Sequence, residues 1–104
     1  MAGMYGMKDL LCLLRREGAE ELRLAADSPV VIVTGGKPRP VDIPGLTLDE
    51  LDILLGSIST EGQREELRKC GDTRFIYVQN STRFAVTARH SSGRLSVIIR
   101  NLDG

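Results

Sequence analysis

The last third of the chain shows the clearest alternation of apolar and polar residues. In segments 82–89 and 94–100 every second residue is apolar: Phe84, Val86 and Ala88 in the first, and Leu95, Val97 and Ile99 in the second. A period of two is typical of strands with one buried face. The intervening residues 90–93 suit a four-residue hairpin loop, in which Gly93 can adopt a positive φ.

This pattern predicts a register for three consecutive antiparallel strands. In the last hairpin we expect four opposed pairs: Val86 with Val97, Phe84 with Ile99, Arg89 with Arg94, and Arg83 with Arg100. With residues 79–82 as the preceding turn, Tyr77 faces Phe84 and Phe75 faces Val86. A shift by one residue would move every apolar side chain to the wrong face.

The opposite face of these strands is unusual because arginines surround a small apolar centre. The arginines are Arg74, Arg83, Arg89, Arg94 and Arg100, and the centre is Ile76, Ala85 and Ile98. Directly opposed like charges are unfavourable. Two interpretations remain open: a helix or the N-terminal segment covers the centre, or the face docks an acidic or phosphorylated partner. The candidate partner- or ligand-binding residues are therefore Arg74, Arg83, Arg89, Arg94, Ile98 and Arg100.

The first part of the chain predicts a helix over 7–17, ended by Gly18, and then three strands. These strands are 20–25, 29–34 and 37–41, with the turn at Gly35-Gly36 joining the last two. Because Pro38 and Pro40 cannot donate ladder hydrogen bonds, the third strand is expected at a sheet edge.

Two helix starts follow, each with the spacing of a capping box. The first joins Thr47 to Glu50, and its helix has a buried stripe: Leu48, Leu51, Leu54, Leu55 and Ile58. The second joins Thr60 to Gln63, and Gly71 ends its helix. The order α-β-β-β-α-α-β-β-β predicts an α+β fold in one domain, residues 1–104. We expect an antiparallel sheet of about six strands, with the helices mainly on one face.

Composition narrows the function by exclusion. Lysine and arginine number 14, as do aspartate and glutamate, so the net charge gives no reason to expect binding to nucleic acid or to an anionic membrane. No apolar run approaches the roughly 20 residues of a membrane span, and the N-terminus lacks the pattern of a secretory signal. Cys12 and Cys70 are far apart without histidine spacing, so we expect reduced thiols in packing roles and a cytoplasmic location.

The sequence contains no recognisable catalytic constellation. His90 is the only histidine, placed in the expected hairpin loop, and Ser91 and Ser92 lack an adjacent acid. Gly36-Lys37 is not a phosphate-binding loop, because no glycine lies five residues earlier and Pro38 replaces the Ser or Thr. We therefore expect no enzyme activity, no cofactor and no metal site.

Several phrases, in order along nearly the whole chain, resemble the N-terminal domain of PilT-type ATPases of type IV pilus retraction and type II secretion. The segments are 10–24 (similar to "LL…A…GASDLHL"), 29–40 ("P…R.DG.L.PL"), 46–58 ("LTPEDVEALLYSIM"), 60–64 ("TDEQR"), 83–86 ("RFRVN") and 98–102 ("VFRRI"). The resemblance implies a PAS-like domain that packs on the motor core of a neighbouring subunit, with arginines near the nucleotide. Arg83 and Arg100 match those arginines, whereas Ala85 and Thr87 replace the family's second arginine and its asparagine. These 104 residues contain no motor core and no Walker motif, which leaves two alternatives open: a free-standing homologue, or a fragment of a longer ATPase.

Two functional hypotheses follow. The first is a non-catalytic protein-interaction module, accessory or regulatory to a type IV pilus or type II secretion ATPase, with the ATPase core or a second copy as its partner. The alternative is a PAS-like sensor that binds an anionic small molecule or nucleotide on the arginine-rich face. Nucleic-acid binding is disfavoured because the chain has no basic helix, and membrane insertion is not expected.

Overall fold

The computed structural model describes residues 6–41, 43 and 45–103. The predicted element order is confirmed, and the fold is α+β. The elements are α1 (Met7–Arg16), β1 (Glu21–Ala25), β2 (Val31–Thr34), β3 (Lys37–Pro40), α2 (Leu48–Ile58), α3 (Glu61–Cys70), β4 (Asp72–Gln79), β5 (Thr82–Ser91) and β6 (Arg94–Asn101).

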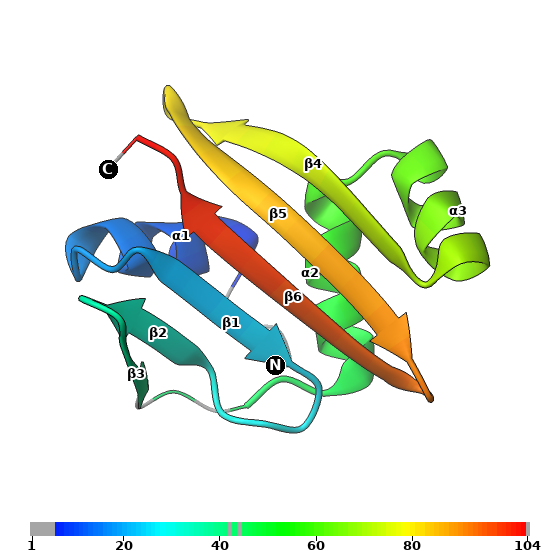
Figure 1. Cartoon of the computed structure of the whole chain (residues 1–104), viewed down its shortest axis with the longest axis horizontal. Coiled ribbons are helices and arrows are strands. Elements are labelled where there is room, and N and C mark those ends of the chain that lie inside the picture. Colours follow the sequence, from blue (N-terminus) through cyan, green and yellow to red (C-terminus); the bar gives the residue numbers. More distant parts are fainter. Residues whose placement is uncertain (1–5, 42, 44, 104) are drawn as a thin grey trace.

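All six strands form one open antiparallel sheet in the order β3-β2-β1-β6-β5-β4. The two three-stranded runs of the chain meet where β1 pairs with β6 in the middle of the sheet. As Figure 1 shows, α1 and α2 lie behind the sheet and α3 lies near β4. The helices therefore leave the other face of the sheet open, which agrees with the predicted placement on one face. No helix among the described residues is long and apolar enough to cross a membrane.

The predicted register is confirmed in one hairpin and wrong in the other. Between β4 and β5, Tyr77 lies opposite Phe84, as expected. Between β5 and β6, Val86 lies opposite Ile99 instead of Val97, a shift of two residues. The cause is the turn: Ser92 and Gly93 have φ of 52° and 76°, so they form a two-residue turn and both strands extend closer to it. An even shift leaves every side chain on its predicted face.

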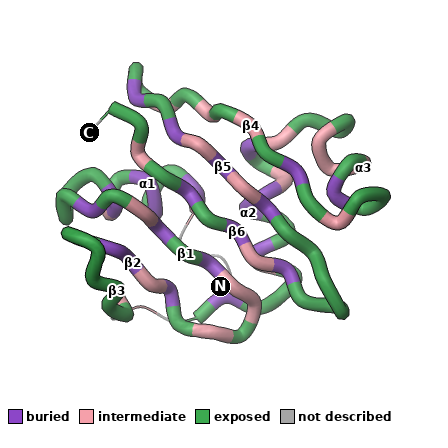
Figure 2. Tube along the Cα trace, in the orientation of Figure 1, coloured by how far each residue is buried: buried purple, intermediate pink, exposed green. Residues whose placement is uncertain are grey.

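The hydrophobic core lies between the helices and the inner face of the sheet (Figure 2). Its largest side chains, all less than 2 % exposed, include Phe84, Leu10, Leu14, Leu22, Leu51 and Ile99. Three expectations of burial were wrong. Leu48 is 40 % exposed, because it occupies the first position of α2, and Cys12 and Cys70 are exposed instead of packed.

Local sequence signals fix the ends of the helices. The Thr47 hydroxyl accepts a hydrogen bond from the Glu50 N–H at 3.1 Å, and a Glu50 carboxylate oxygen accepts one from the Thr47 N–H at 2.8 Å. The same reciprocal pair joins Thr60 and Gln63 at the start of α3. Gly71, with φ of 85°, ends α3 in the left-handed conformation that glycine adopts without strain. Both predicted capping boxes are confirmed.

Candidate functional site

The outer face of the sheet, which is the face opposite α1 and α2, holds all six residues that the sequence predicted to bind a partner or ligand. In each strand its side chains alternate with those of the core. The residues are Glu21 and Arg23 of β1; Arg74, Ile76 and Val78 of β4; Arg83, Ala85, Thr87 and Arg89 of β5; and Arg94, Ser96, Ile98 and Arg100 of β6. We call this set the outer face.

Three large apolar side chains of the outer face are exposed to solvent. Ile76 is 56 % exposed, Val78 58 % and Ile98 37 %. No described helix or loop covers them, so the expectation of a covering helix is wrong for the described residues; a cover by the N-terminal residues 1–5 lies outside the described residues. Val78 was not singled out from the sequence, although it follows Ile76 by two residues in the same strand and therefore shares its face.

The arginines of the outer face are not opposed to one another, contrary to prediction. Arg100 lies between Ala85 and Glu21, and Arg94 lies opposite Ser91. Arg89 lies between Ser96 and Asp72. The two-residue shift of the last hairpin separates the pairs that the sequence placed together, so the expected repulsion across strands is absent.

Arg83 is held by an acid near the C-terminus. Its backbone N–H donates to Asp103 Oδ2 at 2.6 Å, and its Nε and Nη2 donate to Asp103 Oδ1 at 3.2 and 3.1 Å. These hydrogen bonds, from the backbone first and then from the side chain, hold the pKa of the Asp103 carboxyl below its usual range. The Arg83 guanidinium therefore already has an anionic partner within the chain.

Arg100 also has an acid nearby, although more loosely. Its Nε lies 3.7 Å from Glu21 Oε1, while the Nε of Arg23 donates to the other oxygen of the same carboxylate. Sequence reasoning missed Glu21 as a partner of Arg100 because the two residues are 79 positions apart. Only the pairing of β1 with β6 brings them together.

The other three arginines predicted as binding residues, Arg74, Arg89 and Arg94, differ from Arg83 and Arg100. Among the described residues, none forms an ion pair with Arg74, Arg89 or Arg94, and all three are exposed. A guanidinium presents several N–H donors in a plane that matches a carboxylate or phosphate. The outer face thus carries three arginines without a described ion-pair partner on the same side of the sheet as the exposed aliphatic side chains.

His90 lies in β5 and not in a hairpin loop, which corrects the prediction. It pairs in register with Leu95, and its backbone N–H donates to the carbonyl oxygen of Gly71 at 2.8 Å. No group of three or more histidine, cysteine or acidic side chains suited to a metal ion occurs among residues 6–41, 43 and 45–103.

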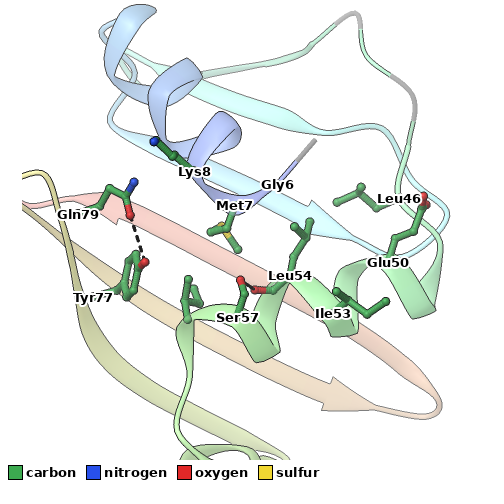
Figure 3. Close-up of a pocket in the computed structure, with 11 residues that line it drawn as sticks. Gly6, Met7, Lys8, Leu46, Glu50, Ile53, Leu54, Ser57, Tyr77 and Gln79 are labelled. Carbon is green, nitrogen blue, oxygen red and sulfur yellow. Dashed lines mark hydrogen bonds between the residues drawn. The ribbon is translucent and has the colours of Figure 1, made fainter. Parts of the chain in front are cut away.

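A separate hollow of 570 Å³ lies on the helical side, between the start of α1, α2 and the end of β4. Figure 3 shows Lys8 and Gln79 at one end of it and Leu46 and Glu50 at the other. The Tyr77 hydroxyl donates to Gln79 Oε1 at 3.1 Å within it. None of the outer-face arginines lines this hollow, so it is a different surface from the candidate site.

Comparison with known proteins finds one sequence relative, a pilus retraction ATPase, which the chain matches over part of that protein's length. No family model matches it. A 95-residue stretch, 90 % of the chain, is 26 % identical to the type IV pilus retraction ATPase PilT of Pseudomonas aeruginosa. The chain is related to the N-terminal region of PilT-type ATPases. It spans 28 % of the length of that PilT.

Two solved structures share the fold. A crystal structure of the pilus retraction motor PilT with bound ADP superposes with a TM-score of 0.83 at 22 % identity, covering 92 % of this chain and 29 % of that one. The ATPase DotB of Legionella pneumophila superposes with a TM-score of 0.73 at 19 % identity, covering 91 % of this chain and 28 % of the other.

The two arginines with acidic neighbours are also the two that the resemblance to PilT-type ATPases concerns. Arg83 and Arg100 are the residues that the family resemblance matched to arginines near a nucleotide. In this chain both have acidic neighbours, Asp103 and Glu21. A ligand that approached either guanidinium would compete with a carboxylate of the same chain, whereas no described residue forms an ion pair with Arg74, Arg89 or Arg94.

Proposed function

We propose that this chain is a non-catalytic protein-interaction module, accessory or regulatory to a type IV pilus or type II secretion ATPase. In this proposal it acts in the cytoplasm and docks through its outer face on an acidic surface of the ATPase. The sequence relation to PilT supports the choice of partner class. The chain's own chemistry supports the choice of surface.

The observation that carries the proposal is the exposed apolar centre beside unpaired cations. Covering Ile76, Val78 and Ile98 would remove from water the large apolar area that they expose. Arg74 and Arg89 would meet carboxylates at the rim of such a contact, where complementary charge speeds association and selects the partner. Arginine is enriched in protein interfaces and among the residues that contribute most to binding energy.

A small anionic ligand on the same face is less well supported. Small-molecule sites are concave and bury most of their ligand. Two hollows, of 570 and 670 Å³, are lined by residues of the helical side and of the β5–β6 hairpin end, and by none of the six outer-face arginines. The arginines lie instead on an open sheet, which suits a broad protein surface.

The test reverses two of the unpaired charges. Arg74→Glu with Arg89→Glu should weaken binding to the pilus or secretion ATPase of the same organism by about thirtyfold or more in calorimetry. The free energy of unfolding should change by less than about 0.5 kcal/mol per site, because both side chains are exposed. The same preparations should show no ATP hydrolysis above background, since phosphoryl transfer needs a phosphate-binding loop and a metal-binding acid.

The matched control is Lys8→Glu with Lys37→Glu. It changes the net charge from 0 by the same amount, but Lys8 lies in α1 and Lys37 in β3, away from the unpaired arginines. The control should bind like the unchanged chain. Equal loss in both double variants would mean that net charge, and not the outer face, governs binding. Tight nucleotide binding that disappears only in the Arg74/Arg89 variant would favour the small-ligand alternative.

A further inference from the structure

The two edges of the sheet have opposite chemistry. β3 and β4 are the outermost strands, and each pairs with only one neighbour among the described residues. An edge strand presents unpaired backbone N–H and C=O groups to any other strand that can approach. In an antiparallel ladder, the backbone N–H and C=O of every second residue bond to the neighbouring strand, and those of the residues in between point away from it.

At the β3 edge, the backbone N–H groups that would point away from the sheet are missing. Val41 N–H donates to the carbonyl oxygen of Val30 at 2.8 Å, so every second residue from Val41 bonds inward to β2. The alternate positions, whose backbone groups point outward, are Pro38 and Pro40. Proline has no N–H, so this edge cannot donate at either position. β3 is closed to pairing with another strand.

At the β4 edge the outward donors are present. His90 N–H donates to the carbonyl oxygen of Gly71 at 2.8 Å, which fixes the alternation from Gly71 onward. The backbone groups of Arg74, Ile76 and Val78 therefore point away from β5. The strand contains no proline or lysine. α3 lies near its beginning (Figure 1), and there the Thr73 hydroxyl donates to a carboxylate oxygen of Glu66. The second half of the edge is open.

We propose that the chain forms a two-fold dimer by antiparallel pairing of its β4 edges. With the two-fold axis at Tyr77, Ile76 lies opposite Val78 of the partner subunit, and the symmetry repeats this pair. The outward N–H and C=O groups of these residues then form four intermolecular hydrogen bonds. The two aliphatic pairs then contact each other and lose part of their exposed area, and the two Tyr77 side chains lie opposite each other on the inner side.

The strand that pairs with the β4 edge is the β4 strand of a second copy, because this edge is complementary to itself. In this register the aliphatic residues meet only each other, and Arg74 lies opposite Asn80 of the partner subunit, so no two arginines are opposed. Head-to-tail growth would need a β3 edge to receive β4, and the prolines prevent it. The contact therefore closes as a dimer and does not extend into a filament.

This inference does not depend on the proposed ATPase partner. The dimer joins the two sheets into one continuous sheet with both outer faces on the same side. Arg89, Arg94 and Ile98 of each copy stay exposed. The Arg74/Arg89 reversal tests the first proposal through partner binding. The variant below tests dimerisation, so each can fail alone.

The experiment is sedimentation equilibrium of the 104-residue chain from micromolar to millimolar concentration. The mass should rise from 11.4 kDa to twice that value as concentration increases. Val78→Pro removes an outward N–H without removing a ladder bond to β5, as Pro38 and Pro40 do in β3. It should weaken dimerisation by about tenfold or more, since two of the four intermolecular hydrogen bonds are lost.

The control Ile98→Ser changes an apolar residue of the outer face away from the edge, and it should dimerise like the unchanged chain. Circular dichroism checks that each variant folds. If Val78→Pro does not fold, Ile76→Lys places a charge at the same edge and should weaken dimerisation instead. A chain that stays at 11.4 kDa up to the highest concentration overturns the proposal. So does a folded edge variant with unchanged dimerisation.

Discussion

The two faces of the β4-β5-β6 strands differ in what covers them, although both carry apolar residues. On the inner face Phe84, Val86 and Ile99 are at most 1 % exposed. On the outer face Ile76 and Ile98 are 56 % and 37 % exposed, with arginines around them. The difference shows that alternation alone assigns residues to faces, whereas the helices decide which face becomes the core.

The packing of α2 on the inner face explains why no charged side chain lies there. α2 contributes a stripe of buried residues, Leu51, Leu54, Leu55 and Ile58, and contacts β1 and β6. A charged side chain beneath it would lose its hydration without a partner. The outer face has no such cover, so its arginines remain hydrated and its aliphatic residues remain available for contact.

The largest expected effect is the loss of an inner-face side chain. Phe84→Ala should cost about 3–5 kcal/mol of unfolding free energy, because the ring is fully buried and its removal leaves a cavity. Ile98→Ala on the outer face should cost less than about 1 kcal/mol. Urea denaturation of both variants measures the contrast. Similar costs at the two sites would show that the outer face is covered in solution and would remove the distinction between the faces.

A smaller effect tests the helix that creates the inner core. Thr47→Ala removes the hydroxyl that accepts the Glu50 N–H, so we expect a loss of about 1 kcal/mol. Thr47→Ser keeps the oxygen and should stay close to the unchanged chain. Denaturation midpoints compare the two variants. A loss of the same size in both would point to the missing methyl group and not to the cap.

The smallest expected effect concerns Asp103, the acid that pairs with Arg83 on the outer face. Because the folded pKa of Asp103 lies below its unfolded value, its pairing stabilises the fold above the unfolded pKa and is lost as pH falls through the folded pKa. Asp103→Asn should therefore lower stability slightly near pH 7 and lose less stability than the unchanged chain between neutral pH and about pH 3. Thermal melts across this range give the comparison, with Asp52→Asn as the control. Parallel curves for Asp103→Asn and the unchanged chain would contradict the pairing.

Much of this architecture could be predicted because its causes are local. Capping boxes at Thr47 and Thr60 need residues three positions apart, and the turn at Gly35-Gly36 needs φ values that glycine adopts freely. The alternation in 82–89 assigned Phe84 inward and Arg83 outward without knowledge of the register. That is why an error of two residues left the candidate face unchanged.

The sequence by itself therefore determined the elements, their order and the residues that share a face, because these depend on periods and spacings within a few residues. Only the tertiary structure decided which arginines are available. Arg83 meets Asp103 across 20 positions, and Arg100 meets Glu21 because the first and last strands pair. Such contacts arise from the packing of distant segments, and no local pattern contains them. The same packing left Arg74, Arg89 and Arg94 without an ion-pair partner among the described residues.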